Sequence, residues 1–379
     1  MSRPVTTGIP VDNHRTTPLS AVAQFAGALK QSEAVDFLWL WDELSIWFPG
    51  DLWSTKYTPA AAVVDGAALY DPFVEAAYAA ALNPNIGLRL TTDSIRSGPV
   101  ELLRRMLTLA NCTSGPTVCA IGAGELRQTK PFGYKRSEGI KRLEDTFVLV
   151  RKLYDSLEPF SYEGNFWNYK NAFIGGARPA IRPEFWALGG GPVLLDIAAK
   201  HADGFEAAVP HAISSPDKFA KIARMLREKV EGYGRDPDKF GMGIWFICIS
   251  HEDPEVIEKV LDSPLIRFFA ALSGRMDATE WIAEGMTPPM PEGWHYANSW
   301  SPCEQTVDEV NGIVSRVPKE MARKSFYCGT PDQLAKISRQ YIDAGADFVG
   351  LLDYTPLVLG PADGMASVQR GIKIFRSQK

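Results

Sequence analysis

The segment of residues 117–125 constrains the fold of this chain more than any other. It reads Thr-Val-Cys-Ala-Ile-Gly-Ala-Gly-Glu, an apolar and β-branched run that stops at two glycines and a carboxylate. A buried parallel strand ends this way when it delivers a charged side chain to a ligand that the backbone approaches closely. A similar run at 185–192 ends in three glycines and a proline. Two such strand ends together predict a barrel enzyme.

Apolar runs alternate with amphipathic segments along the whole chain, which predicts repeated βα units around a parallel sheet. The predicted strands are residues 5–11, 36–41, 85–92, 117–121, 184–188, 204–209, 241–249 and 346–352. The predicted helices between them include 18–34, 71–82, 98–111, 137–156, 193–201, 217–232 and 331–344. Eight parallel strands separated by helices predict an α/β protein with a (β/α)8 TIM-barrel fold, as one domain over residues 1–379.

One segment, about residues 253–324, is too long to be a simple connector between the seventh strand and the last predicted helix. We therefore expect it to be an insertion after strand seven. Three interpretations remain open: a substrate lid, a dimer contact, and packing against the helical shell. Its aromatic residues are Phe268, Phe269, Trp281, Trp294, Tyr296 and Trp300.

Composition excludes several classes of function. The net charge is −5 without a stripe of lysine and arginine, so we expect no nucleic-acid partner. The chain has no run of about 18 apolar residues and no apolar leader after Met1, which predicts no membrane span and a cytoplasmic location. The five cysteines are scattered without a C-x-x-C pair, and the histidines lack ligand spacing. We therefore predict neither a disulfide framework nor a metal site.

Carboxylates and glycines follow the predicted strands at the end where barrel enzymes carry their catalytic groups. Glu125 ends the fourth strand, and Asp42 and Glu43 end the second. We predict catalytic roles for these three residues, against the alternatives of helix capping and simple pairing with arginine. Gly189, Gly190 and Gly191 precede a predicted helix, where their amides favour binding of an anion.

Several motifs, in one order along most of the chain, resemble the bacterial-luciferase-like superfamily of flavin- and deazaflavin-dependent oxidoreductases. The Gly-Ala-Gly-Glu form of 122–125 and the Asp42-Glu43 strand end are most similar to the branch that uses coenzyme F420. Thr92-Asp93 and residues 329–332 are similar to the phthiodiolone ketoreductases within that branch. The motifs are Ala-Ile-Gly-Ala-Gly-Glu (120–125), Lys-Pro-Phe-Gly (130–133), Arg-Leu-Glu (142–144), Leu-Gly-Gly-Gly-Pro (188–192), Ala-Asp-Gly (202–204), Cys-Gly-Thr-Pro-Asp-Gln-Leu (328–334) and Gly-Ala-Asp-Phe (345–348).

The resemblance implies that the cofactor, F420 or alternatively FMN, lies at the carboxyl ends of the strands, with its phosphate on the three-glycine segment. It also implies an active-site aromatic at Trp47, a homodimer, and a non-prolyl cis peptide near residues 89–91. The implied cofactor contacts are Asp42, Leu90, Thr91, Thr92, Glu125, Leu188, Gly189, Gly190 and Gly191.

Position 43 departs from the resemblance, because the F420 branch frequently has histidine after the aspartate. The glutamate that stands here has a reference pKa of about 4.3, compared with about 6.5 for histidine. To donate a proton near neutral pH, Glu43 would need burial that raises its pKa.

We therefore predict an oxidoreductase that moves a hydride between the deazaflavin and an organic substrate, with Glu43 or Glu125 handling the proton. The substrate group is a carbonyl, its alcohol, or an activated double bond, and the many tryptophans favour a bulky or apolar molecule. Two alternatives remain: an FMN-dependent monooxygenase of the same fold, and a flavin-binding protein without catalytic activity.

Overall fold

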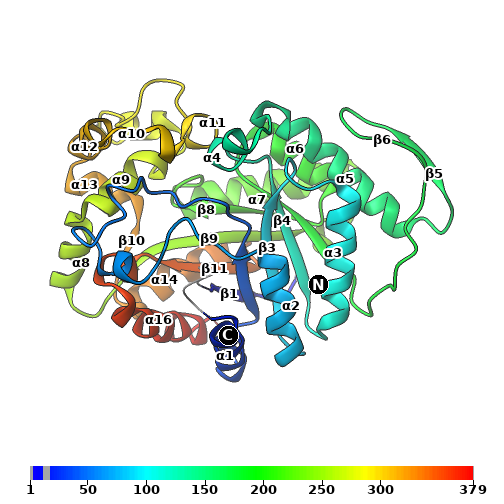
Figure 1. The fold of residues 1–379 in the computed structure, drawn as a ribbon, viewed down its shortest axis with the longest axis horizontal. Coiled ribbons are helices and arrows are strands. Elements are labelled where there is room, and N and C mark those ends of the chain that lie inside the picture. The colour runs from blue at the N-terminus through cyan, green and yellow to red at the C-terminus, as the bar shows by residue number, and fades with distance from the viewer. Residues whose placement is uncertain (1–2, 12–17, 379) are drawn as a thin grey trace.

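A closed parallel barrel forms the centre of the molecule. The structure is a computed structural model, and it describes residues 3–11 and 18–378. Neighbouring strands pair in parallel all the way round, and the pairing of β8 with β9 closes the ring. Figure 1 shows the strands at the centre with the helices around them. This confirms the predicted α/β (β/α)8 TIM barrel. The barrel strands are β1 (Thr6–Pro10), β2 (Phe37–Trp41), β3 (Gly87–Asp93), β4 (Thr117–Gly122), β7 (Glu184–Leu188), β8 (Gly204–Val209), β9 (Gly241–Ser250) and β11 (Phe348–Asp353).

Helices surround the barrel, and several of them begin at strong start signals. Asp71, Ser215 and Thr330 cap the helices that follow them by accepting hydrogen bonds from first-turn amides. A proline at the first helical position fixes the backbone at each of these starts. The surrounding helices are α1 (Leu19–Gln31), α2 (Pro72–Leu82), α3 (Pro99–Cys112), α5 (Gly139–Asp155), α6 (Pro192–His201), α7 (Pro216–Gly232), α14 (Pro331–Asp343) and α16 (Gly364–Arg376).

Each strand is apolar on both faces because one face meets the helices and the other fills the barrel. In β2, Leu38 and Leu40 pack into the layer between the strands and the helices, whereas Trp39 packs inside against Trp245 and Phe348. Arg89 also lies inside, where its Nε donates to Glu206 Oε2 at 2.9 Å. The interior is therefore a packed core, and the open space for a ligand is at the ends of the strands.

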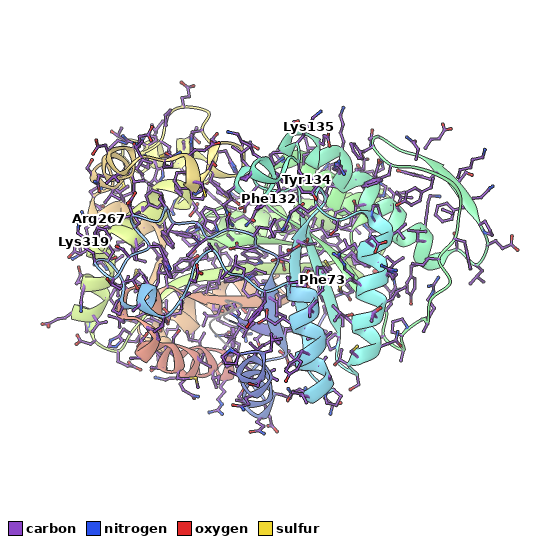
Figure 2. All side chains as sticks on the ribbon, viewed as in Figure 1. Phe73, Phe132, Tyr134, Lys135, Arg267 and Lys319 are labelled. Carbon is purple, nitrogen blue, oxygen red and sulfur yellow. The ribbon has the colours of Figure 1, made fainter. Side chains whose placement is uncertain are left out.

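The insertion forms a helical layer beside the carboxyl ends of the strands, at one end of the molecule in Figure 1. Phe268, Trp281 and Trp300 are almost completely buried in its core, so the packing interpretation applies to these aromatics. Arg267 and Lys319, labelled in Figure 2, form ion pairs with Asp262 on the outside of this layer. Its helices are α8 (Pro254–Asp262), α9 (Pro264–Ser273), α10 (Ala278–Ala283), α11 (Tyr296–Ser299), α12 (Val307–Ser315) and α13 (Lys319–Ser325).

Several elements were not predicted from the sequence pattern, and two of them involve strands. An antiparallel hairpin of β5 (Phe160–Glu163) and β6 (Asn168–Ala172) projects from the end opposite the insertion in Figure 1. Its residues are mostly polar and half exposed, so it lacks the apolar run of a buried strand. The short strand β10 (Tyr327–Gly329) adds to the edge of β9.

The expectation of a cis peptide near residues 89–91 is wrong. Among the described residues, the cis bond is Val209–Pro210. Strand β3 instead keeps continuous pairing with β2 and β4 through the segment in question, which leaves no bulge there.

Of the helices that the structure describes, none combines the length and the apolar character that crossing a membrane requires.

Candidate active site

The mouth of the barrel, meaning the end formed by the carboxyl ends of the strands, brings Glu43 and Glu125 together. Glu43 follows β2, and Glu125 follows β4 as the residue that begins the short helix α4 (Leu126–Thr129). Between them lies Arg127, whose side chain is only 2 % exposed. We call Glu43, Arg127 and Glu125 the glutamate cluster.

Arg127 binds both carboxylates at once. Its Nη2 donates to Glu43 Oε1 at 2.8 Å, and its Nε donates to Glu125 Oε2 at 2.8 Å. Its Nη1 donates to the carbonyl of Ser45, and its guanidinium lies 4.7 Å from the ring centre of Trp47. The two glutamate side chains remain about a quarter exposed, and the second oxygen of each carboxylate has no hydrogen-bond donor among the described residues, so each keeps a free edge.

Local backbone geometry explains how α4 reaches this position. Gly124 has a φ of +84°, and a Cβ there would lie 2.7 Å from the Ile95 side chain, so glycine is required at the turn. The helix that follows docks onto the loop after β2, because the amide of Leu44 donates to Gln128 Oε1 at 2.7 Å. The glycine before Glu125 therefore serves the turn that presents this carboxylate.

Asp42 turns away from Glu43 into a second cluster. Its Oδ2 accepts from the Thr92 hydroxyl at 2.6 Å, and its Oδ1 accepts from Arg96 Nη1 at 3.1 Å. Asp93 binds the same arginine and also accepts from the amides of Ile95 and Arg96 at 2.8 and 2.9 Å. We call Asp42, Thr92, Asp93 and Arg96 the aspartate cluster. It ties the ends of β2 and β3 together.

Burial raises the pKa of two of the predicted catalytic carboxyls. For Glu125, burial is the largest influence, with Arg127 opposing it and the charge of Glu43 adding to it. For Asp42, burial again leads, opposed by Arg96 and by the hydrogen bond from Thr92. A carboxyl with a raised pKa is able to carry a proton closer to neutral pH, which is what a general acid requires.

Aromatic side chains form one wall of the mouth. The ring of Trp47 lies 4.8 Å from that of Tyr296 and 5.4 Å from that of Phe269, and Phe269 lies 4.7 Å from Tyr354. The Trp47 carbonyl accepts from Trp300 Nε1 at 2.9 Å, which fixes the loop after β2 against the insertion. Burial raises the pKa of both tyrosines, so their hydroxyls stay protonated. The insertion thus contributes Phe269 and Tyr296 directly to the mouth.

The three glycines lie between β7 and α6, as predicted. Gly189 has a φ of +139°, a conformation that other residues rarely adopt, and it donates to the carbonyl of Glu206 at 3.0 Å. Gly191 is the N-cap of α6, and a Cβ there would meet no atom within 4 Å. Among the described residues, the amides of Gly190 and Gly191 have no hydrogen-bond acceptor. This is an open N-terminus with the chemistry to hold a phosphate.

The remaining predicted cofactor contacts fall on different faces of their strands. Leu188 lies on the inner face of β7 beside Trp186, and Thr91 pairs with Trp41 and Ala120 near the mouth. Leu90 instead lies in the apolar layer between the strands and the helices, with no exposed surface. Its side chain cannot reach a ligand at the mouth, because neighbouring residues of a strand point to opposite faces.

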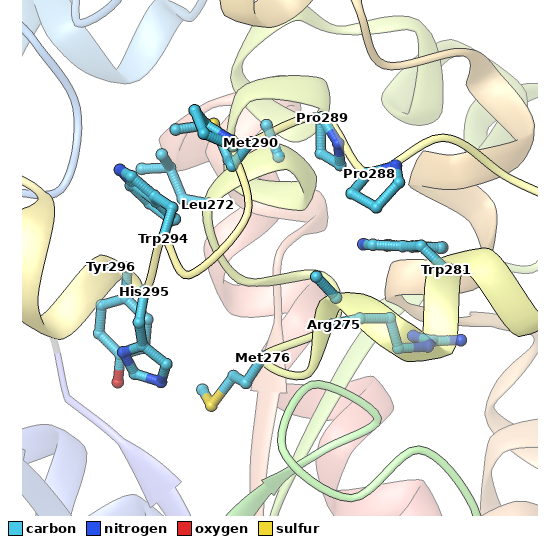
Figure 3. A pocket seen from close by; sticks show the side chains of 13 residues that line it. Leu272, Arg275, Met276, Trp281, Pro288, Pro289, Met290, Trp294, His295 and Tyr296 are labelled. Atoms are coloured by element: carbon cyan, nitrogen blue, oxygen red, sulfur yellow. The ribbon is translucent and has the colours of Figure 1, made fainter.

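A hollow lies beside the mouth, within the insertion. It is partly open to solvent, and Figure 3 shows Trp281, Pro288 and Met290 on its walls. Tyr296 belongs both to this hollow and to the aromatic wall of the mouth. Residues 117–125 and 185–192 do not contribute to its lining.

Sequence reasoning did not predict that Arg127 joins the two glutamates, and it left the role of Tyr296 open. The separation in sequence explains this, since Arg127 is 84 positions from Glu43, and Tyr296 belongs to the insertion. One signal for Arg127 was present, because it follows Glu125 by two residues. In the described part of the chain, histidine, cysteine, aspartate and glutamate side chains form no group of three or more that is suited to hold a metal.

Comparisons with known proteins place the chain in a family. Residues 5–347 match the family described as luciferase-like monooxygenase. A phthiodiolone/phenolphthiodiolone dimycocerosates ketoreductase of Mycobacterium sp. (strain JLS) is 27 % identical over 365 residues, which cover 94 % of this chain and 93 % of the relative.

Two solved structures share the fold. An F420-dependent secondary alcohol dehydrogenase, in complex with an F420-acetone adduct, superposes with a TM-score of 0.71 at 17 % identity and covers 98 % of this chain and 97 % of its own. An EDTA monooxygenase from Chelativorans sp. BNC1 superposes with a TM-score of 0.67 at 14 % identity, covering 99 % and 94 %. At these identities the likeness extends to the fold alone.

Proposed function

The chain belongs to the luciferase-like monooxygenase family, and we propose that it is an F420-dependent oxidoreductase that interconverts a ketone and a secondary alcohol. The observation that carries the proposal is the glutamate cluster, which places a carboxyl of raised pKa at the mouth of the barrel. The ketoreductase among its relatives, similar along nearly the whole chain, supports a carbonyl as the reacting group.

The residues around the mouth fit a cofactor with a ring and a phosphate. The open amides of Gly190 and Gly191, at the start of α6, would hold the phosphate, and Thr91 and Leu188 would contact the ring from the inner faces of β3 and β7. F420, when bound, supplies or accepts the hydride. Substituting Gly189 would disturb this cradle, since its backbone is in a region that favours glycine.

The chain itself supplies the proton and the shape of the pocket. Glu125 would donate a proton to the carbonyl oxygen during reduction and recover it during alcohol oxidation. The wall of Trp47, Phe269 and Tyr296 would place an apolar substrate against the ring and exclude water. We therefore propose a bulky, apolar ketone as the substrate, rather than a charged one.

A fluorescence titration of the purified protein with F420, and separately with FMN, tests the proposal. We expect micromolar binding of F420 and much weaker binding of FMN. A preference for FMN would replace the proposal with an FMN-dependent monooxygenase. Binding of F420 without turnover of any ketone or alcohol would favour a flavin-binding protein without catalytic activity.

We also propose that the protein is a homodimer. Light scattering on the purified protein at micromolar concentration is the direct measurement. A mass near twice 41.8 kDa is the expected result, and a mass near 41.8 kDa would contradict it.

A further inference from the structure

We propose that Arg127 is a positioning residue that couples Glu43 and Glu125 into one acid–base unit, with a single proton held by Glu125. This inference deepens the proposed function by assigning the residue that positions and tunes the proton donor. It rests on the proposed function for its chemistry, whereas the coupling itself is a property of the protein without any ligand.

The geometry of Arg127 matches a residue that serves two carboxylates. A guanidinium is a rigid fork, so donors fixed on Glu43 and on Glu125 hold the two carboxyl groups at a set separation. Both hydrogen bonds are 2.8 Å long, and the arginine is buried while the glutamates are partly open. Its third contact, with the Ser45 carbonyl, prevents the fork from following one glutamate alone.

Charge explains why the unit holds one proton. One positive charge cannot balance two carboxylates in a partly buried site, so the second carboxylate binds a proton more readily than it would in water. Within the described residues, neither carboxylate accepts a hydrogen bond from a backbone amide or a hydroxyl. In the aspartate cluster, by contrast, two amides and the Thr92 hydroxyl also donate to the carboxylates.

Other charged or titratable groups face the unit from the surrounding elements. Asp93, at the end of β3, adds negative charge near Glu125, and the Tyr296 hydroxyl from α11 and Tyr354 after β11 lie within electrostatic range. Arg136, after α4, contributes a positive charge that acts on Glu125 as well as on Tyr296 and His295. Among the described residues, none of these groups hydrogen-bonds to the glutamates, so Arg127 remains the direct partner of both carboxylates.

The free edge of Glu125 gives the unit its chemistry. In the reducing direction, the carbonyl carbon would gain a C–H bond from a hydride that bound, reduced F420 supplies, and the C=O π pair would take the proton of Glu125. The products would be the alcohol, a Glu125 carboxylate and the oxidised deazaflavin, whose remaining ring proton would pass to water. Arg127 then stabilises two carboxylates until water returns one proton to Glu125.

Two substitutions with opposite effects test the inference. The rate of ketone reduction should decline as pH rises and Glu125 loses its proton. Arg127→Gln removes the charge that favours the Glu125 carboxylate, so we expect this decline to occur at a pH about 1–3 units higher. Glu43→Gln makes Glu125 the remaining carboxylate partner of Arg127, so we expect the decline in rate to occur at lower pH. The control is Lys130→Gln, three residues after Arg127, which removes an exposed ion pair with Glu304. This substitution should not change the pH dependence of ketone reduction.

A second readout uses the protein without cofactor. A carboxyl whose pKa is raised on folding contributes stability that is present below its unfolded pKa and is lost as pH rises through its folded pKa. Thermal unfolding between about pH 4 and about pH 9 should show this loss of stability at higher pH in Arg127→Gln and at lower pH in Glu43→Gln. Glu43→Gln keeps the buried arginine and one of its carboxylate partners, so it remains informative if Arg127→Gln does not fold.

Shifts in the same direction, or an unmoved profile in both readouts, would overturn the inference. If Arg127 had a structural role alone, its substitution would lower activity at every pH without changing the pH at which the rate declines. If the wild-type protein turns over no ketone, the proposed function fails, and the unfolding profiles alone decide whether the two glutamates share a proton.

Discussion

The glutamate cluster and the aspartate cluster contain the same charges and differ in what surrounds them. Each consists of two carboxylates on one arginine, and they begin at the neighbouring residues Asp42 and Glu43. In the aspartate cluster the carboxylate side chains are 16 % and 7 % exposed. In the glutamate cluster they are 26 % and 25 % exposed, around an arginine that is 2 % exposed.

This difference separates a structural ion-pair group from a chemical one. Backbone amides and a hydroxyl complete the aspartate cluster, so its lone pairs are engaged and its position is fixed. The glutamate cluster keeps open carboxylate edges at the mouth beside Trp47. The type of residue at a strand end therefore does not decide its role. The remaining donors and the free edge decide it.

The largest expected effect is on the rate of ketone reduction. Glu125→Gln removes the proposed proton donor while keeping its size, so the rate should fall by about 10²–10⁴-fold. Asp93→Asn in the aspartate cluster should change the rate far less, because its carboxylate is enclosed. Steady-state assays with F420 at saturation measure both. Equal losses in the two variants would remove the distinction between the clusters.

The next effect is on stability. Arg96→Met leaves Asp42 and Asp93 buried without their cation, which should cost about 3–5 kcal/mol of unfolding free energy. The control is Arg104→Met, which breaks an exposed pair with Glu101 and should cost at most about 1 kcal/mol. Denaturant unfolding measures both values. A cost for Arg96→Met as small as that of the control would show that the aspartate cluster does not hold the strand ends.

Cofactor affinity should respond to the glycine segment. Gly189→Ala forces a strained φ of +139° on a residue with a Cβ, so the amides that follow should shift and F420 should bind on the order of tenfold more weakly. Gly191→Ala places its Cβ in open space at a φ of −70° and should have little effect. Fluorescence titration distinguishes them, and equal affinities would argue against a phosphate on this segment.

A carboxyl at the opposite end of the barrel gives the smallest effect. Burial raises the pKa of Asp347 to about 7, against Arg3 and the Met242 amide. Because the folded pKa is the higher one, its contribution to stability is lost as pH rises through about 7. Asp347→Asn should flatten that decline, by an amount on the order of 1 kcal/mol. Thermal unfolding against pH measures it, and an unchanged slope would contradict the assignment.

The sequence predicted the barrel because its strands are long apolar runs and its helices begin at strong caps such as Thr330. It also predicted that Glu43 and Glu125 lie at the same end of the barrel. It did not predict that Arg127 joins them or that Asp42 turns the other way. Both depend on how the loops after β2 and β4 meet, which no local pattern records. The hairpin of β5 and β6 was missed because its strands are polar.

The direct test of the central claim is a single turnover without oxygen. The protein, loaded with reduced F420, is mixed rapidly with an apolar methyl ketone, and the oxidised deazaflavin and the alcohol are quantified. We predict that both form in equal amounts in the wild-type protein and only slowly in Glu125→Gln. Failure to oxidise the deazaflavin without oxygen, together with substrate oxidation by reduced FMN and O₂, would contradict the claim and identify a monooxygenase.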